Sequence, residues 1–298
     1  MELIDFTEKN EKPIILALGY FDSVHNGHKK LLEECLNGEY LPAVFTFKNN
    51  PQSCISGECK QCYTFAERVE IFAKIGIKMV IRSEFDKNFM CLTGKEFLRT
   101  LVEKHNIKKV VFGKDYTCGV NAEYKQEDVK KFFEERNIPV KIVDLLMSGS
   151  DKIASRNIRN LLKNGKIEEV NSLLPYPYFL QGIVEKGRNV GSNVVGYPTA
   201  NVTFPYDKIE IKAGVYKTNI YIDGKSYIGL SNVGAHPTFD DYNFNIESFV
   251  IGFCGNLYGK TIRIEFLRYL RGVKKFNNAM ELKAQIDYDL TVVTGTDK

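Results

Sequence analysis

The sequence lacks the features that mark membrane, secreted and nucleic-acid-binding proteins. It has no apolar run near the roughly 18 residues that cross a membrane as a helix. Its polar beginning, MELIDFTEKNEK, resembles neither a signal peptide nor a transit peptide. Lys plus Arg number 41 against 37 Asp plus Glu, and this small excess does not by itself indicate nucleic acid or membrane partners. We therefore expect a cytoplasmic protein without nucleic acid or membrane partners.

A disulfide framework is also not expected. Seven cysteines make an odd number, which fits reduced thiols better than paired ones. Cys54, Cys59 and Cys62 have the C-x4-C-x2-C spacing of a plant-type iron–sulfur loop. That cluster needs a fourth thiolate, which only a chance arrangement of the fold could supply. We favour a loop that tolerates cysteine over a metal or redox site.

The first half of the chain alternates strand and helix signals. The length of 298 residues suggests about two domains, and the 44% of hydrophobic residues exclude disorder as the main state. Two helices begin at capping boxes, Thr64 with Glu67 and Thr93 with Glu96. Helices separate five short apolar runs, at Pro13–Gly19, Leu41–Phe47, Met79–Arg82, Lys109–Phe112 and Val140–Val143. This alternation predicts an α/β domain with a doubly wound parallel sheet.

The second half has a different pattern. Two short helices follow Ser155, and Pro175-Tyr-Pro177 then interrupts the chain. Short β-branched and aromatic runs separated by turns predict an antiparallel β-barrel, and Leu282, Ile286 and Leu290 give the last helix an apolar stripe. We expect two domains, residues 1–175 and 179–298.

Two of the four histidines lie in one segment, Gly19-Tyr-Phe-Asp-Ser-Val-His25-Asn-Gly27-His28. The segment joins the first predicted strand to the first helix, where open α/β sheets bind ligands. The helix N-terminus offers N–H groups and a positive dipole to an anion, and Gly27 lets a phosphate approach the backbone. His25 and His28 can donate hydrogen bonds to charge that develops on phosphorus. His105 lacks this context, and we interpret it as a structural residue.

This segment resembles the G-x-F-D-x-x-H-x-G-H signature of the nucleotidyltransferase superfamily, and more narrowly the adenylyltransferase half of prokaryotic bifunctional riboflavin kinase/FAD synthetases. Val44–Phe47 is similar to the family's second strand, and GKDYTCG at 113–119 to its G-x-D/N-F-x-F-G segment. The sequence ASRNIR at 154–159 resembles its S-S-T-x-I-R motif. The resemblance implies the following roles: Gly19, Phe21, Asp22 and Gly27 at ATP phosphates, Asp115 beside flavin and nucleotide, Ser155 and Arg159 on ATP phosphates, and His25, His28 and Arg159 in catalysis.

Three departures from that family pattern concern how ATP and flavin are held. Ser23 stands where the family usually has glycine, and Arg156 replaces the threonine of S-S-T. The sequence Lys48-Asn-Asn-Pro51 replaces the usual D-P-H-P. Both histidines and Arg159 are retained.

A second set of chemical residues lies in the predicted barrel. The glycines of Gly187-Arg-Asn-Val-Gly191 and Gly196 could cradle phosphate through backbone N–H groups, although the spacing is not that of a Walker motif. Thr199 and Asn201 offer oxygen ligands suited to Mg²⁺. Composition alone would favour an ordinary turn.

Strand alternation places Glu247 on one face with Phe249, Ile251 and Phe253. A carboxylate buried on such a face would have a raised pKa, toward that of a useful base. The alternative is a strand edge or end at which Glu247 lies in water.

The sequence Pro198-Thr199-Ala200-Asn201 resembles the hallmark of the riboflavin kinase module. Similar later motifs follow in order at 214–216, 231–239 and 257–259, so the resemblance covers roughly residues 13–290. It implies that Thr199 and Asn201 bind Mg²⁺ and ATP phosphates, and that Glu247 is the general base for the ribityl 5′-hydroxyl.

Together the two resemblances imply a bifunctional transferase. The barrel would phosphorylate riboflavin with ATP to give FMN, and the N-terminal domain would adenylylate FMN with a second ATP to give FAD and pyrophosphate. Flavin is then substrate and product. Two alternatives stay open: an enzyme that retains one of the activities, and a flavin-binding regulatory protein without turnover.

Overall fold

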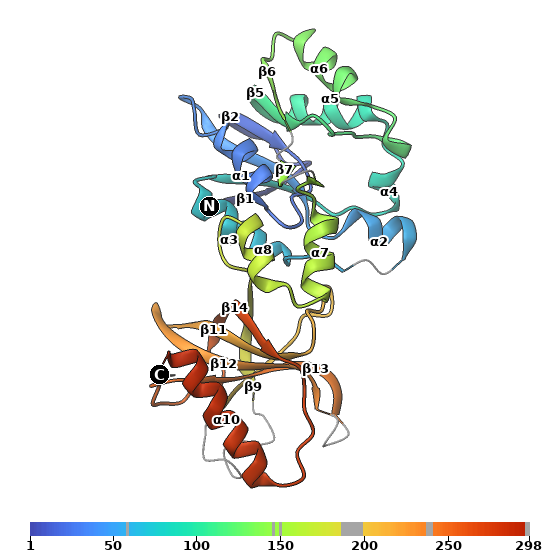
Figure 1. Cartoon of the computed structure of the whole chain (residues 1–298). Helices are drawn as coiled ribbons and strands as arrows, with labels where there is room; N and C mark the ends of the chain where they lie inside the picture. Colours follow the sequence, from blue (N-terminus) through green and yellow to red (C-terminus); the bar gives the residue numbers. More distant parts are fainter. Residues whose placement is uncertain (58–59, 145–146, 149–150, 186–198, 237–240, 296–298) are drawn as a thin grey trace. The chain divides into compact units, whose positions relative to one another are not determined.

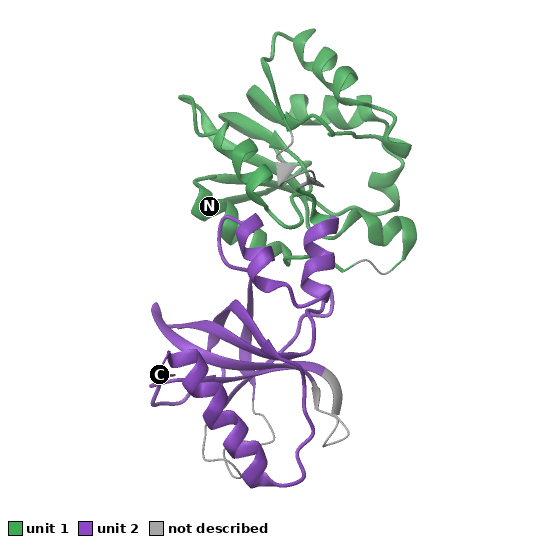
Figure 2. Cartoon of the chain, in the orientation of Figure 1, with its two compact units in different colours: residues 1–155 green, residues 156–298 purple. Residues whose placement is uncertain are grey.

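The structure, a computed structural model, describes residues 1–57, 60–144, 147–148, 151–185, 199–236 and 241–295. The chain forms two compact units, residues 1–155 and residues 156–298 (Figure 2). Each unit is described by itself.

The first unit is a six-stranded, all-parallel sheet with helices on both faces (Figure 1), which confirms the predicted α/β class. The strand order is β1-β4-β3-β2-β5-β6. The strands are β1 (Glu2–Asp5), β2 (Asn10–Leu18), β3 (Leu41–Phe47), β4 (Met79–Ser83), β5 (His105–Gly113) and β6 (Val140–Val143). The helices are α1 (Asn26–Glu33), α2 (Pro51–Ser56), α3 (Phe65–Ile75), α4 (Lys87–Met90), α5 (Gly94–Lys104) and α6 (Gln126–Glu134), with a short 3₁₀ turn, η1 (Val120–Ala122). A two-stranded antiparallel ribbon, β7 (Met147–Ser148) with β8 (Asp151–Lys152), follows β6.

Both faces of this sheet are buried, because alternate residues of each central strand point to opposite faces. On β2, Ile14, Leu16 and Leu18 join the large core cluster that includes Phe97 of α5 and Phe133 of α6. The other face carries α1 and α3, whose Leu31, Leu32, Ile71 and Phe72 are buried. Since every strand is parallel, all the carboxyl ends lie along one edge of the sheet.

Local sequence signals account for most of these elements. Thr64 and Thr93 each accept the backbone N–H of the glutamate three residues on, and that glutamate accepts the N–H of its threonine, so both predicted capping boxes are present. The strand β1 was not predicted, because it is short and two of its four residues are exposed. It pairs in parallel with β4 at the edge of the sheet.

His105 has a structural role, as its sequence context indicated. It is 2% exposed, and its Nε2 lies 3.2 Å from the carbonyl oxygen of Phe6. Burial lowers the pKa of this imidazole, so its neutral form is favoured in the core.

The second unit contains two helices before its barrel, α7 (Ser155–Lys163) and α8 (Ile167–Leu173). The first residue of α7, Ser155, is the last residue of the first unit. A closed barrel follows, with strand order β10-β13-β12-β11-β14-β9 and every pairing antiparallel. Its strands are β9 (Phe179–Glu185), β10 (Thr199–Thr203), β11 (Gly214–Ile222), β12 (Lys225–His236), β13 (Asp241–Val250) and β14 (Thr261–Arg271), and the helix α10 (Ala279–Thr294) comes last. The predicted barrel with a C-terminal helix is confirmed.

Side chains of the antiparallel barrel divide between its interior and its outer face. Thr218, Ser231 and Ser248 are fully buried and form a chain of hydroxyl contacts of 2.8 and 2.7 Å across three strands. On the outer face Ile286 and Leu290 of α10 pack against an apolar cluster built on Val215, Leu230 and Val293 and extended by Phe249 and Ile251. Two residues of the predicted stripe, Ile286 and Leu290, therefore pack as their spacing indicated, whereas Leu282 is half-buried and is not part of this cluster.

One ion pair fixes α10 to the barrel. Arg271 at the end of β14 donates from Nε to both carboxylate oxygens of Asp289, at 3.2 and 3.0 Å, and from Nη2 to Oδ2 at 2.7 Å. Asp289 is 3% exposed and also accepts a hydrogen bond from Gln285. Such a charge-assisted, forked contact fixes orientation as well as position.

Candidate active sites

The two histidines of the first unit lie face to face at the start of α1. His25 is the N-cap residue, and its Nδ1 accepts the backbone N–H of His28 at 3.1 Å. The rings are stacked, with centroids 3.7 Å apart and planes 12° apart. Because Nδ1 of His25 accepts a hydrogen bond, the ring proton of its neutral form is on Nε2. The sequence predicted the proximity of the two histidines, and the structure adds their stacking and the tautomer of His25.

The turn before α1 holds two residues in left-handed backbone conformations, Phe21 (φ +56°) and Val24 (φ +41°). Both side chains are buried, and the Phe21 ring meets the edges of His28 and Phe72 at centroid distances of 5.1 and 5.8 Å. A Cβ on Gly19 would lie 2.7 Å from the Phe21 ring. Gly19 therefore leaves room for the buried Phe21 ring, which gives this residue a steric role.

Side-chain contacts to neighbouring segments hold the same turn. Asp22 is 3% exposed and accepts the backbone N–H of Cys62 at 2.8 Å. The hydroxyl of Ser23 lies 2.9 Å from that of Ser155, the first residue of α7. Ser23 is fully buried, and the glycine usual at this position could not make that contact.

Asp115 lies at the carboxyl end of β5, the strand paired with β2, so it is on the same edge of the sheet as the histidine turn. Its Oδ1 would be 3.0 Å from a Cβ on Gly113, so the carboxylate folds back over that glycine. The loop is anchored at Gly119, where φ is +83° and a Cβ would be 2.3 Å from the backbone nitrogen of Gly94. Asp115 itself is exposed and accessible to a ligand at this edge.

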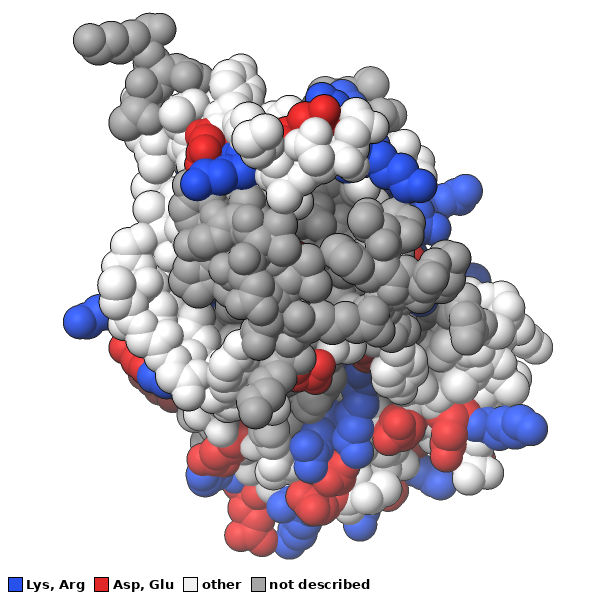
Figure 3. Space-filling model, turned by 90° about the horizontal axis from the view of Figure 1, so that it is seen from below, with Lys and Arg blue, Asp and Glu red and all other residues white. Residues whose placement is uncertain are grey.

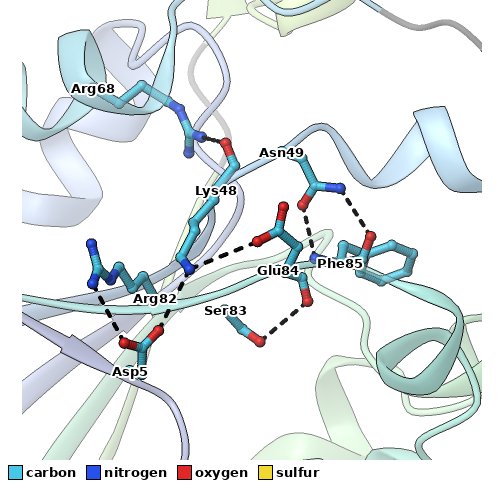
Figure 4. Close-up of polar contacts among 8 residues, drawn as sticks. All are labelled: Asp5, Lys48, Asn49, Arg68, Arg82, Ser83, Glu84 and Phe85. Carbon is cyan, nitrogen blue, oxygen red and sulfur yellow. Dashed lines mark hydrogen bonds and ion pairs between the residues drawn. The ribbon is translucent and has the colours of Figure 1, made fainter.

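The segment Lys48–Pro51, which departs from the family pattern, makes contacts within the first unit (Figure 4). Asn49 pairs with the backbone of Phe85 through both amide atoms, at 2.9 and 2.8 Å. Lys48 Nζ lies 3.6 Å from Asp5 and 3.7 Å from Glu84. The polar side chains here therefore tie together the carboxyl ends of β1, β3 and β4.

Arg159 lies one turn after Ser155 on α7 and is half-buried beside the buried Ile158. The boundary between the two compact units falls between Ser155 and Arg156, so Ser155 belongs to the first unit and Arg159 to the second. Within the second unit, α8 is fixed to the barrel through Asn171, whose side chain bonds the backbone of Tyr178 and of Phe266 at 2.8 Å each.

The predicted residues of the barrel form one row across adjacent strands. Asn201 on β10 is paired directly with Glu247 on β13, and Glu247 with Asn232 on β12. Thr199, two residues before Asn201 on the same face, donates a hydrogen bond from Oγ1 to Glu247 Oε1 at 2.7 Å. Glu247 lies in the middle of its strand and is half-buried. Its environment is therefore between the two predicted alternatives, a buried apolar face and a strand end in water.

Some of the predicted residues cannot be placed. Gly187, Gly191 and Gly196 lie outside the described residues, so the predicted phosphate loop has no structural description. Asn232, opposite Glu247, is an additional polar residue of the row that we had not singled out. Its signal in the sequence was the Ser231–Gly234 motif, part of the resemblance to the riboflavin kinase module.

The segment with the iron–sulfur spacing, Cys54 to Cys62, forms no metal site among the residues that the structure describes. No three His, Cys, Asp or Glu side chains gather there as a metal site, although Cys59 itself is not described. Cys54 is exposed, and Cys62 is buried. Burial raises the pKa of Cys35 and of Cys118 to about 12, so these thiols are not activated.

Helix length and surface charge bear on the predictions about membranes and nucleic acids. None of the described helices is both long and apolar enough to cross a membrane. On the face shown in Figure 3, Lys and Arg side chains are intermixed with Asp and Glu, so the charges that are visible there do not form a basic stripe.

Two family models match the chain in the order that the motifs predicted. The FAD synthetase model matches residues 7–157, and the riboflavin kinase model matches residues 174–295.

Individual relatives match nearly the whole chain. The bifunctional riboflavin kinase/FMN adenylyltransferase of Listeria monocytogenes is 32% identical over 283 residues, 92% of this chain and 90% of that protein. The protein of the same name from Bacillus subtilis is 32% identical with the same coverage, and that from Escherichia coli K12 is 27% identical over 96% of this chain and 93% of its own. A crystal structure described as a macrolide-efflux protein from Streptococcus pneumoniae is 27% identical, covers 99% of both chains and superposes with a TM-score of 0.88.

Proposed function

Since the chain belongs to the family of bifunctional riboflavin kinase/FMN adenylyltransferases, we propose that the two residue sets described above carry its two reactions. The protein is a transferase that converts riboflavin to FMN and FMN to FAD, with ATP as the second substrate. The observation that supports the residue assignment best is that each matched region contains its own organised set: the stacked histidines in one, and the Thr199–Glu247 pair in the other.

In the kinase reaction Glu247 acts as the general base. Its carboxylate takes the proton of the ribityl 5′-hydroxyl while that oxygen bonds to the γ-phosphorus of ATP and ADP leaves. The hydrogen bond from Thr199 fixes one carboxylate oxygen and leaves the other, Oε2, to accept the proton. Asn232, directly across from Glu247, lies on the same face and can orient the substrate hydroxyl.

The donor set on β10 fits Mg²⁺. Thr199 uses its proton on Glu247, so the lone pairs of its hydroxyl remain available to a cation, and the amide oxygen of Asn201 is a second hard ligand. Bound Mg²⁺ would neutralise charge on the ATP phosphates. Thr199 and Asn201 would hold the ion, and Gly187, Gly191 and Gly196 would approach the phosphates.

In the adenylyl transfer reaction an oxygen of the FMN phosphate bonds to the α-phosphorus of ATP and pyrophosphate leaves. His25, through Nε2–H, and His28 donate hydrogen bonds to the charge that develops on the transferring group, and Arg159 stabilises the leaving pyrophosphate. The N-terminus of α1, with Gly27 in its first turn, receives phosphate. Gly19, Phe21 and Asp22 shape the turn, Ser155 orients phosphate, and Asp115 lies beside the flavin and nucleotide.

We assign adenylyl transfer to residues 1–175 and the kinase reaction to residues 179–298. The first assignment includes α7 because Ser155 and Arg159 match a motif of the adenylyltransferase half. We place the enzyme in the cytoplasm, where both flavin and ATP are accessible.

A time course with riboflavin and Mg-ATP tests the assignment of two active sites. We expect FMN to rise first and FAD to follow, as resolved by chromatography. If FMN accumulates and no FAD forms, adenylyl transfer is not retained; if only added FMN is converted, the kinase is silent. Flavin binding without ATP consumption would instead show a regulatory protein.

A double-mutant cycle tests whether Ser23 orients Ser155. We expect Ser155→Ala to lower kcat/KM for ATP in FAD formation about tenfold, and Ser23→Ala to lower it about threefold to tenfold, because each loses a hydrogen bond that serves an anionic ligand. The double variant should be no worse than Ser155→Ala, since Ser23 then has no hydroxyl to orient. Multiplying effects would show that Ser23 acts independently of Ser155.

A further inference from the structure

A fully buried arginine contacts the backbone just before the histidine turn. Arg68 on α3 is 0% exposed. Its Nη1 donates to the carbonyl oxygen of Tyr20 at 2.9 Å and to Thr46 Oγ1 at 2.8 Å. Its Nη2 donates to the carbonyl oxygens of Phe47 at 2.7 Å and Lys48 at 3.2 Å; Figure 4 shows the last of these contacts.

Burial of a guanidinium is unfavourable for folding, so an arginine at this position indicates a role beyond filling space. Removing a guanidinium from water is strongly unfavourable unless good hydrogen bonds replace those that water made. An apolar side chain of similar size would fill the same space without that cost. The planar fork of Arg68 instead reaches four acceptors on two strand ends at once, and Thr46 in turn donates to the carbonyl of Tyr20 at 2.7 Å. Aromatic rings of Tyr20 and Phe65 face the guanidinium at 4.8 and 5.6 Å.

The backbone that Arg68 fixes leads directly into a strained segment. Tyr20 precedes Phe21, and the left-handed conformations of Phe21 and Val24 persist only where the surroundings determine them. His25 follows Val24 at once, so any rotation of the turn moves both stacked imidazoles. Arg68 thus determines the backbone at the entry of the turn.

We propose that Arg68 is a positioning residue for adenylyl transfer. It acts through the carbonyl of Tyr20 and the end of β3, and it holds the turn in the conformation that aims His25 and His28 at the transferring phosphorus. This inference rests on the proposed role of the two histidines. Because the histidines act on the transition state, loss of the guanidinium should lower kcat and leave the KM for FMN nearly unchanged.

The test compares Arg68→Met in the full chain with a matched core variant, Phe133→Leu. Phe133 is also 0% exposed, but it lies on α6 in the core cluster on the opposite face of the sheet from α3. We expect Arg68→Met to lower kcat for FMN adenylylation about 100-fold, the order of loss that small misplacements of catalytic groups cause. Phe133→Leu should stay within about twofold at temperatures well below its melting temperature. Riboflavin phosphorylation by the same polypeptides is the internal control.

Two milder variants keep the proposal testable if Arg68→Met does not fold. Thr46→Val removes one hydroxyl from the network, and Arg68→Lys keeps the charge but loses the fork; each should lower kcat about tenfold. The proposal is overturned if the variants that fold retain the kcat of Phe133→Leu at matched melting temperatures. A wild-type enzyme that forms no FAD from FMN would overturn the proposed function and this inference together.

Discussion

Replacing Glu247 with glutamine is expected to lower kcat for FMN formation by about 10²–10⁴-fold, the range that general bases contribute. Glutamine keeps the shape of the side chain and an oxygen that can accept the hydroxyl of Thr199. It cannot take the proton of the ribityl hydroxyl. The measurement is the initial rate of FMN formation from riboflavin and Mg-ATP at saturating concentrations.

Two controls separate loss of the base from damage to the barrel. Glu265→Gln removes a carboxylate from the same barrel, one that accepts the hydroxyl of Tyr221 at 3.2 Å and pairs with the buried Arg263 at 2.9 Å. Loss of that pair should lower the melting temperature, but well below it kcat should remain within a few-fold. FAD formation from added FMN by Glu247→Gln should equal that of the wild type. If Glu247→Gln phosphorylates riboflavin at the wild-type rate, Glu247 is not the base.

The architecture could be predicted because the signals in question are local. The runs Leu41–Phe47 and Val140–Val143 became strands with those same bounds, and the capping boxes at Thr64 and Thr93 start α3 and α5. Strand β1 could not be predicted, because it is stabilised by pairing with β4, whose partner residues lie more than 70 positions away. Its own sequence, ELID, is too short and too polar to show a periodic pattern.

The sites were predictable to the extent that spacing determines them. The i, i+3 spacing of His25 and His28 on a helix start places both on one face, and the alternation of Thr199 and Asn201 does the same on a strand. The i, i+3, i+4, i+7 spacing does place Arg68 on the face of α3 that carries Ile71, Phe72 and Ile75, but a charged residue is normally expected at the surface, so its burial was not predicted. Its burial depends on the carbonyl groups of two strands that are distant in the sequence.

In both proposed sites a neutral hydroxyl contacts a residue that we assign to the substrate. In the barrel, Thr199 donates to Glu247; in the first unit, Ser23 contacts Ser155. A hydroxyl orients its partner without adding charge, so Glu247 keeps its negative charge and Ser155 keeps a neutral hydroxyl for the substrate. Both hydroxyls come from neighbouring segments of backbone that are held by other contacts, which reduces the reorganisation needed when substrate binds.

Replacing His28 with asparagine is expected to lower kcat for FAD formation by about 10²–10³-fold, the loss typical for one donor to a developing oxyanion. His28 is better suited to this test than His25, because His25 also caps α1 and its loss would disturb the helix. In the variant the backbone N–H of residue 28 still bonds His25 Nδ1, so the cap is retained. Because the interaction is made in the transition state, kcat and kcat/KM should fall together.

The neighbouring Lys29 provides the matched control for this variant. It carries a charge one residue further along α1, but its Nζ is directed to Glu33, one turn on, at 3.2 Å. Lys29→Ala loses only an exposed helix pair, which contributes little to stability. The variant should therefore fold normally and retain FAD formation within about twofold. Riboflavin phosphorylation should be unaffected in both variants, because the Thr199–Glu247 row belongs to the other unit. A His28→Asn enzyme within threefold of the wild type would instead assign the stabilising role to His25 and the helix N-terminus.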